Sequence, residues 1–127
     1  MKIAFASGDG KRIDAHFGQC RYFSIFELNG DKYRWLESRT IRVESDSDEH
    51  ENRVARRAEA IGDCTLLFVS SIGNDAVRRL RKEGIMILRA EPESEVIPQM
   101  EGLLKLLRER PPLWLLKAVR RAGERSG

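Results

Sequence analysis

The sequence has few cysteines and histidines and no long apolar run. Its 127 residues include 2 cysteines and 2 histidines. No apolar stretch approaches the roughly 20 residues that a membrane-spanning helix needs, so we expect no membrane association. Two cysteines indicate free thiols in a reducing compartment rather than a disulfide framework. The chain enters its first predicted strand at once, and we therefore expect a cytoplasmic protein without a signal peptide.

The chain also lacks a strong excess of either charge. Its formal net charge is +3. A nucleic-acid-binding protein usually carries a larger basic footprint, so nucleic acid is not an expected partner. A mild basic bias suits an anionic ligand or an acidic protein partner.

Apolar runs and turn residues predict alternating strands and helices. Strands are predicted at residues 3–6, 22–28, 33–43, 65–69 and 85–88, and helices at residues 52–61, at 76–83 and between Pro92 and Pro111. This order, β-β-β-α-β-α-β-α, predicts an α/β fold with a mixed sheet of about five strands and helices on both faces. The last two strands flank a helix and should therefore be parallel.

Two segments outside this pattern need separate interpretations. Residues 44–51 form an acidic run without a glycine-turned cation-binding pattern, which favours a solvated connector. A composition change at Arg110 divides the chain into an α/β domain at residues 1–110 and an amphipathic C-terminal tail at residues 111–127.

A polar loop between the first two strands carries the histidine best placed for chemistry. His16 is followed by Phe17 and by Gly18, which permits a positive φ and a close approach to the backbone. A neutral imidazole here can ligate a transition metal. The alternative is a loop histidine that bonds a nearby carbonyl, because one histidine alone makes no metal site. The residues leave both interpretations open.

One cysteine also has two interpretations, and several other residues have one each. Cys20 could be a thiolate ligand of an iron–sulfur cluster, or a half-buried small apolar residue. Cys64 and Met86 are interpreted as core residues. Arg53, Arg56 and Arg57 are expected on the solvent face of the first helix.

Four ordered motifs resemble one known family. The stretch from Ile13 to Gly18, followed by an aromatic strand, resembles the signature loop of the dinitrogenase iron–molybdenum cofactor biosynthesis family. That family includes NifX- and NafY-type carriers and the C-terminal part of NifB-type proteins. The stretch from Gly62 to Gly73, the pair Gly84-Ile85 and the stretch from Pro111 to Lys117 match further family patterns. One departure is Met86, where many NifX-like chains are expected to carry histidine and proline.

The resemblance implies a ribonuclease-H-like fold and a carrier without catalysis. Family members bind the nitrogenase iron–molybdenum cofactor or its iron–sulfur precursor during cofactor assembly and nitrogenase maturation. Nitrogenase assembly proteins, and apo-dinitrogenase in one version of the role, are the implied partners. The histidine of the His-Phe-Gly loop is the family's candidate metal ligand, and here it is His16.

A division of roles follows for the predicted site. If the strands before the His16 loop and before residues 70–74 are neighbours, both segments lie at the sheet edge where α/β proteins bind ligands. The second segment also supplies a helix start, which attracts anions. A cluster with an organic acid attached is a large anion. The predicted cofactor-binding residues are His16, Cys20, Lys11, Arg12, Arg21, Ser71, Ile72 and Gly73, with His16 as the metal ligand and no catalytic residue.

Two other functions compete with the carrier. A metal-dependent nuclease of ribonuclease-H-like fold would need converging carboxylates, for which Asp9 and Asp14 are the candidates. A protein-binding accessory or chaperone domain could present the apolar stretch from Leu113 to Leu116 to a partner, unless Trp114 folds back onto the core.

Overall fold

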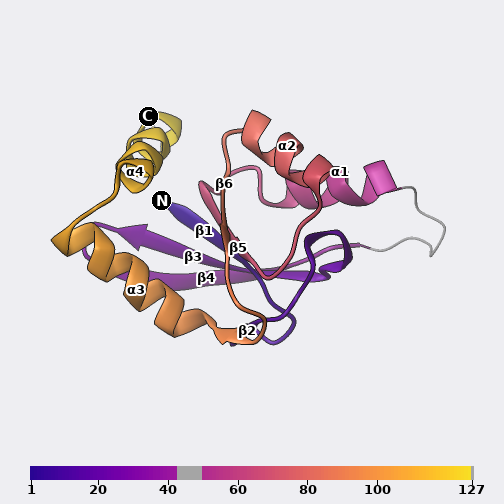
Figure 1. Ribbon diagram of the computed structural model, residues 1–127, viewed down its shortest axis with the longest axis horizontal. Helices are drawn as coiled ribbons and strands as arrows, with labels where there is room; N and C mark the ends of the chain where they lie inside the picture. Colours follow the sequence, from indigo (N-terminus) through magenta and orange to yellow (C-terminus); the bar gives the residue numbers. More distant parts are fainter. Residues whose placement is uncertain (43–49, 127) are drawn as a thin grey trace.

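The chain forms a mixed five-stranded sheet, with strand order β4-β3-β1-β5-β6, covered by helices on both faces (Figure 1). This computed structural model describes residues 1–42 and 50–126. The sheet strands are β1 (Lys2–Ala6), β3 (Tyr22–Asn29), β4 (Lys32–Thr40), β5 (Leu66–Val69) and β6 (Met86–Arg89). The helices are α1 (His50–Ala60), α2 (Asn74–Lys82), α3 (Val96–Glu109) and α4 (Leu113–Ser126), with a short 3-10 helix, η1, at Phe17–Gln19.

The sheet is antiparallel on one side and parallel on the other, and the parallel pairing predicted for the last two strands is confirmed. β3 pairs antiparallel with both β1 and β4, and the β3–β4 hairpin turns at Gly30, which has a φ of +65°. β5 pairs parallel with β1 on one side and with β6 on the other. The α/β prediction with helices on both faces is confirmed. The ribonuclease-H-like assignment stays a prediction.

Successive side chains of the central strands point to opposite faces of the sheet and build two apolar clusters, one on each face. Ala4 and Ala6 of β1 join the cluster under α1 and α2. Ile3 and Phe5 join the cluster under α3 and α4, where Phe5 stacks on Phe68 with ring centroids 4.7 Å apart. Every side chain of β5 is buried, because this strand has a neighbour on each side and helices on both faces.

The sequence pattern missed a second, two-stranded sheet. β2 (Arg12–Ile13) pairs antiparallel with β7 (Ser94–Glu95). Ile13 is buried in the cluster under α3, and the backbone N–H of Val96, the first residue of α3, donates to the carbonyl of Lys11 over 2.8 Å. The His16 loop is therefore tied to the start of α3, far along the chain.

Two interpretations of single residues are wrong. Arg57 was expected in solvent, but it is buried, and its Nε donates to the carbonyl oxygen of Cys20 over 2.9 Å. A long side chain with several N–H donors can be buried when its donors find carbonyl partners. Met86 was expected in the core, but it is 37% exposed on the edge strand β6.

The C-terminal segment is a helix, α4, that packs on the apolar cluster under α3 and α4. Leu115 and Ala118 of α4 are buried, and Trp114 is partly buried against the same cluster. The division at Arg110 stays a prediction. The acidic connector predicted at residues 44–51, and the predicted end of the third strand at residue 43, lie largely outside the described residues. Within the described residues, no helix has both the length and the apolar character needed to cross a membrane.

Candidate functional site

The loop after β1 is shaped by its own carboxylates. Asp9 Oδ1 accepts the backbone N–H groups of Lys11 and Arg12 over 2.8 and 2.9 Å. These bonds favour the charged form and lower the pKa of Asp9. Asp14 Oδ1 accepts the N–H of Gly8 over 3.0 Å. Both carboxylates therefore hold the loop in shape.

The second half of the loop is tied to the segment after β5. His16 and Ser71 form a parallel β-bridge, and the N–H of Phe17 donates to the carbonyl of Ser71 over 2.9 Å. The hydroxyl of Ser70 donates to the carbonyl of Ala15 over 2.8 Å. Phe17 is fully buried in the cluster under α1 and α2. Because β1 and β5 are parallel neighbours, the loops that follow them meet at one sheet edge.

The imidazole of His16 is held by Ser71. Nδ1 of the ring lies 2.7 Å from Ser71 Oγ. When Nδ1–H donates to this oxygen, Nε2 carries the lone pair that can bind a metal. No described residue bonds to Nε2. The ring is half-buried, so it is positioned by the protein and still reachable.

His16 lines a shallow depression of about 340 Å³. Its other lining residues come from the same loop and the start of β3: Gly8, Asp14, Ala15, Gln19, Cys20, Arg21 and Tyr22. Gly18 lies against the ring, since a Cβ added there would come within 3.6 Å of both Cδ2 and Nε2 of His16. Gly18 does not have the positive φ that the sequence suggested. Its small size beside the imidazole is the feature that the structure supports.

The segment from Ser71 to Gly73 leads directly into α2. Ser71 and Gly73 are exposed, and Ile72 is partly buried against the cluster under α1 and α2. Gly73 precedes the first helical residue in an extended conformation, and no side chain caps the helix start. The free N–H groups and the positive dipole end of a helix start attract anions. The His16 ring is bonded to Ser71, three residues before this helix begins.

Only one of the three cations predicted for the site lies at the depression beside His16. Arg21 lines the depression. Lys11 and Arg12 lie instead with β2, where Nη1 of Arg12 is 4.0 Å from Oε2 of Glu93. Neither Lys11 nor Arg12 lines the depression.

Cys20 lies at the depression but packs inward. It is 2% exposed, and its thiol donates to the carbonyl of Tyr22 over 2.8 Å. Burial raises the pKa of Cys20 to about 11, so the thiolate form is disfavoured. These observations favour the packing interpretation of Cys20 over the ligand interpretation. Cys64 is buried in the core, as predicted, and burial raises its pKa to about 12.

A known protein family matches most of this chain. The family described as dinitrogenase iron-molybdenum cofactor matches residues 1–105. The chain belongs to this family. Its membership supports a role in nitrogenase cofactor biosynthesis.

Individual relatives of the iron-molybdenum cofactor family match over nearly the whole chain. Protein NifX of Herbaspirillum seropedicae is 30% identical, with 98% of this chain and 86% of that protein covered. Protein NifX of Azotobacter vinelandii is 32% identical, with 95% and 76% covered. Protein NifY of Azotobacter vinelandii is 35% identical over 94% of this chain, which spans about half (48%) of that protein. The crystal structure of PH0822 shares the fold, with a TM-score of 0.64 at 17% identity over 83% of this chain and 91% of that chain.

Some residues at the site of this family member were not predicted. Ser70 ties the His16 loop to β5, while Asp14 and Gln19 line the depression. Asp14 and Gln19 could have been found by their position, since each lies within three residues of His16 in the same loop. Ser70 had no distinguishing signal, because a serine after a strand is common in turns.

Proposed function

We propose that this chain holds the nitrogenase iron–molybdenum cofactor, or its iron–sulfur precursor, as transient cargo during cofactor assembly and nitrogenase maturation. One observation carries the proposal: Ser71 holds the His16 ring at the sheet edge, and Nε2 has no hydrogen-bond partner among the described residues. Membership in the iron-molybdenum cofactor family supports the identity of the cargo.

The proposed roles divide between ligation and electrostatics. His16 ligates a metal of the cluster through Nε2, in the tautomer whose Nδ1–H donates to Ser71 Oγ. Arg21, the backbone from Ser71 to Gly73 and the start of α2 attract the anionic periphery of the cargo. One imidazole and a set of weak electrostatic contacts allow release, which a carrier needs. Imidazole is a suitable ligand for iron.

Three predicted residues have smaller roles in this proposal. Lys11 and Arg12 act at longer range by raising the positive potential around the loop. Cys20 supports the depression through packing, because its thiol is buried and bonded to a carbonyl.

The carrier needs no catalytic group, and the nuclease alternative lacks support from the carboxylates. Asp9 and Asp14 accept backbone N–H groups of their own loop. A nuclease would use them as ligands of catalytic metal ions. Loss of a metal-dependent hydrolysis in Asp9→Asn and Asp14→Asn variants would support the nuclease instead.

The test of the carrier is an anaerobic titration of the purified chain with the isolated cofactor, followed by the cofactor's visible absorbance. The His16→Ala variant should bind on the order of 100-fold more weakly, with an unchanged melting temperature. His50→Ala is the matched control, because the sequence has only 2 histidines. Equal affinities of wild type and His16→Ala would remove His16 from the site.

An accessory role toward assembly proteins or apo-dinitrogenase has one supporting observation. Leu113 is 66% exposed on α4, and Leu116 is also exposed. Deletion from Pro111 would remove buried Leu115 and disturb the core. The better variant is Leu113→Ser with Leu116→Ser, which should keep cofactor binding and lose partner capture if these residues form the contact.

A further inference from the structure

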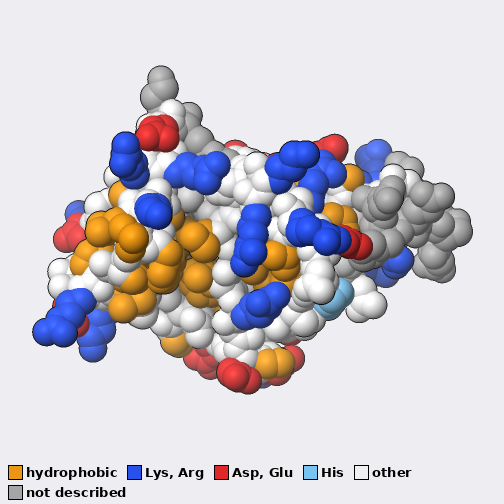
Figure 2. Space-filling model, turned by 45° about the horizontal axis from the view of Figure 1, so that its top comes forward, with side chains coloured by type: hydrophobic (Ala, Val, Ile, Leu, Met, Phe, Trp, Pro, Cys, Tyr) orange, Lys and Arg blue, Asp and Glu red, His pale blue; other side chains and the backbone are white. Residues whose placement is uncertain are grey.

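A second hollow, of about 400 Å³, lies where α2, β6 and α4 meet. It is separate from the depression beside His16, and the two share no lining residue. Its charged lining residues are all cations: Arg81, Arg89, Lys117 and Arg121. Figure 2 shows Lys and Arg side chains around a strip of hydrophobic atoms on the face that includes α2 and α4.

Within the part of the chain that the structure describes, these four cations lack the acidic partners that some arginines have. Arg39 is paired with Asp63, and Arg79 with Glu83. Among the described residues, none of the four lining cations has an acidic group within salt-bridge distance. Like charges gathered at one place repel one another and raise the free energy of the folded state. An anionic occupant would remove this cost.

The hollow is built around one cation in particular. Gly84 has a φ of +85°, and a Cβ added there would come within 2.3–2.5 Å of the guanidinium of Arg121. A side chain at position 84 would therefore displace Arg121. The glycine lets this cation from α4 lie directly against the backbone that leads into β6.

The edge of β6 offers backbone groups to an extended partner. β6 is the last strand of the sheet, and in Figure 1 its ribbon crosses in front of the other strands. The N–H groups of Met86 and Ala90 donate to Thr65 and Val69, on the β5 side. Because alternate residues of a strand point their backbone groups in opposite directions, those of Ile87 and Arg89 point away from β5. Both residues line the hollow.

We propose that this surface binds an acidic, extended segment of a partner protein. The segment adds to the free edge of β6, exchanges hydrogen bonds with Ile87 and Arg89, and places carboxylates beside the four cations. A small anion would accept from the N–H groups but would leave the two carbonyls unpaired. An extended polypeptide has both donors and acceptors at the required spacing. Met86, which is 37% exposed on β6, offers a contact to apolar side chains of the partner segment.

The first experiment measures fluorescence anisotropy of a labelled peptide of alternating glutamate and valine. The wild-type chain should bind it, and affinity should fall as salt is added. The Lys117→Glu/Arg121→Glu variant should bind about tenfold more weakly or worse. Arg120→Glu, on the same helix but 83% exposed and outside the hollow, is the matched control and should bind as wild type does. Equal binding by the double variant would overturn the proposal.

Two further measurements distinguish pairing of a peptide strand with β6 from the binding of any anion. The same peptide, N-methylated at alternate residues so that it cannot pair with a strand edge, should lose binding. If the methylated peptide, inorganic tripolyphosphate or a short single-stranded DNA binds as tightly, the site recognises charge alone and the proposal is wrong. Should the double variant melt at a lower temperature, Lys117→Gln/Arg121→Gln replaces it.

This proposal does not depend on the carrier role. His16→Ala should bind the acidic peptide with wild-type affinity, because the two sites share no residue. The charge variants should in turn bind the cofactor normally. Failure of either proposal therefore leaves the other to be judged on its own result.

Discussion

Nδ1 of His16 lies 2.7 Å from Oγ of Ser71, a residue 55 positions further along the chain. The contact exists because β1 and β5 are parallel neighbours whose following loops meet. It orients the ring and, with the hydroxyl as acceptor, sets which nitrogen is free.

Replacing Ser71 tests whether this orientation matters. Ser71→Ala removes the hydroxyl but keeps the hydrogen bonds to the backbone of Ala15 and of Phe17, since these use Ser70 Oγ and the Ser71 carbonyl. We expect cofactor affinity to fall about tenfold, as for other outer-shell partners of metal-binding histidines. Anaerobic titration measures it. Ser70→Ala is the comparison: it should loosen the loop and lower the melting temperature, whereas Ser71→Ala should not.

A methyl group at position 18 tests access to the ring. In Gly18→Ala the new Cβ would lie 3.6 Å from Nε2 of His16, in ordinary van der Waals contact. Position 18 has no positive φ, so the free energy of unfolding should change by less than about 1 kcal/mol. Cofactor affinity should fall because the methyl group narrows the approach to Nε2.

The matched control for that substitution is Gly102→Ala in α3. A Cβ there meets no atom within 4 Å, and alanine in a helix should raise stability by about 1 kcal/mol. Cofactor affinity should not change. Equal affinities of the two glycine variants would show that cargo does not approach the ring from the Gly18 side.

The position of the loop could be predicted from the sequence, and its internal course could not. Apolar runs gave the strands, and the short link from β5 through α2 to β6 gave a parallel pair. β2 and β7 have two residues each, too few for any periodicity. The separation of Lys11 and Arg12 from the depression follows from this unseen pair. The burial of Arg57 depends on a bond to the Cys20 carbonyl, which no local pattern records.

Cys20 provides a test of the difference between packing and ligation. Cys20→Ala should lower the free energy of unfolding by about 1 kcal/mol through lost packing, with cofactor affinity unchanged. In the wild type, thiol-specific reagents should label Cys20 slowly below its pKa of about 11 and quickly after unfolding. Loss of cofactor binding in Cys20→Ala, with the fold intact, would make Cys20 a ligand.

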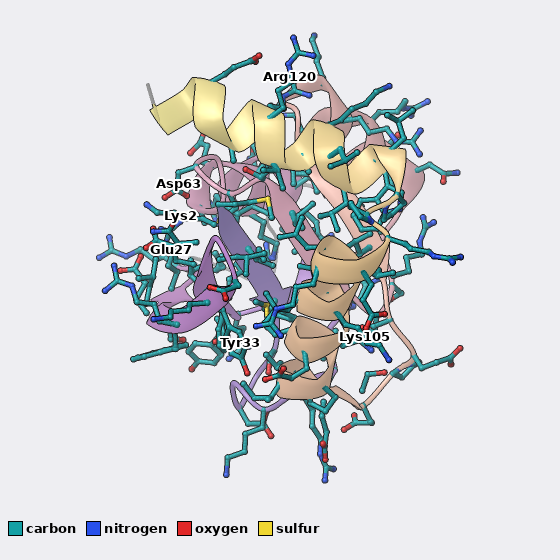
Figure 3. All side chains as sticks on the ribbon, turned by 90° about the vertical axis from the view of Figure 1, so that its left-hand side faces the viewer. Lys2, Glu27, Tyr33, Asp63, Lys105 and Arg120 are labelled. Atoms are coloured by element: carbon teal, nitrogen blue, oxygen red, sulfur yellow. The ribbon has the colours of Figure 1, made fainter. Side chains whose placement is uncertain are left out.

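Asp63 should control stability in acid. Its carboxylate accepts from Lys2 over 3.1 Å and from Arg39 over 2.6 and 2.9 Å, and in Figure 3 the labelled side chains of Lys2 and Asp63 lie together. Arg39 first, and then Lys2, lower the pKa of Asp63 below its ordinary value of 3.8. Because the pKa is lowered in the folded state, the stabilisation is complete above the unfolded value and is lost as pH falls.

Asp63→Asn should therefore destabilise the chain at neutral pH by about 1 kcal/mol, a figure reduced for the partial exposure of the group. It should also make stability depend less on pH in the acid range. Denaturant unfolding from neutral pH down to pH values below 3.8 measures both. Glu124→Gln, which breaks an exposed pair with Arg120, is the control and should leave the pH dependence as in wild type. If the free energy of unfolding falls with pH in the same way in wild type and in Asp63→Asn, Asp63 is not the group that controls stability in acid.

Ligation of a cluster metal by the His16 imidazole is the central claim, and pulsed electron paramagnetic resonance tests it most directly. The chain, labelled with ¹⁵N in its histidines, is loaded anaerobically with the isolated cofactor in a paramagnetic state. We expect a ¹⁵N hyperfine coupling that persists in His50→Ala and disappears in His16→Ala. A loaded protein without this coupling, or one whose coupling is unchanged in His16→Ala, would contradict the account.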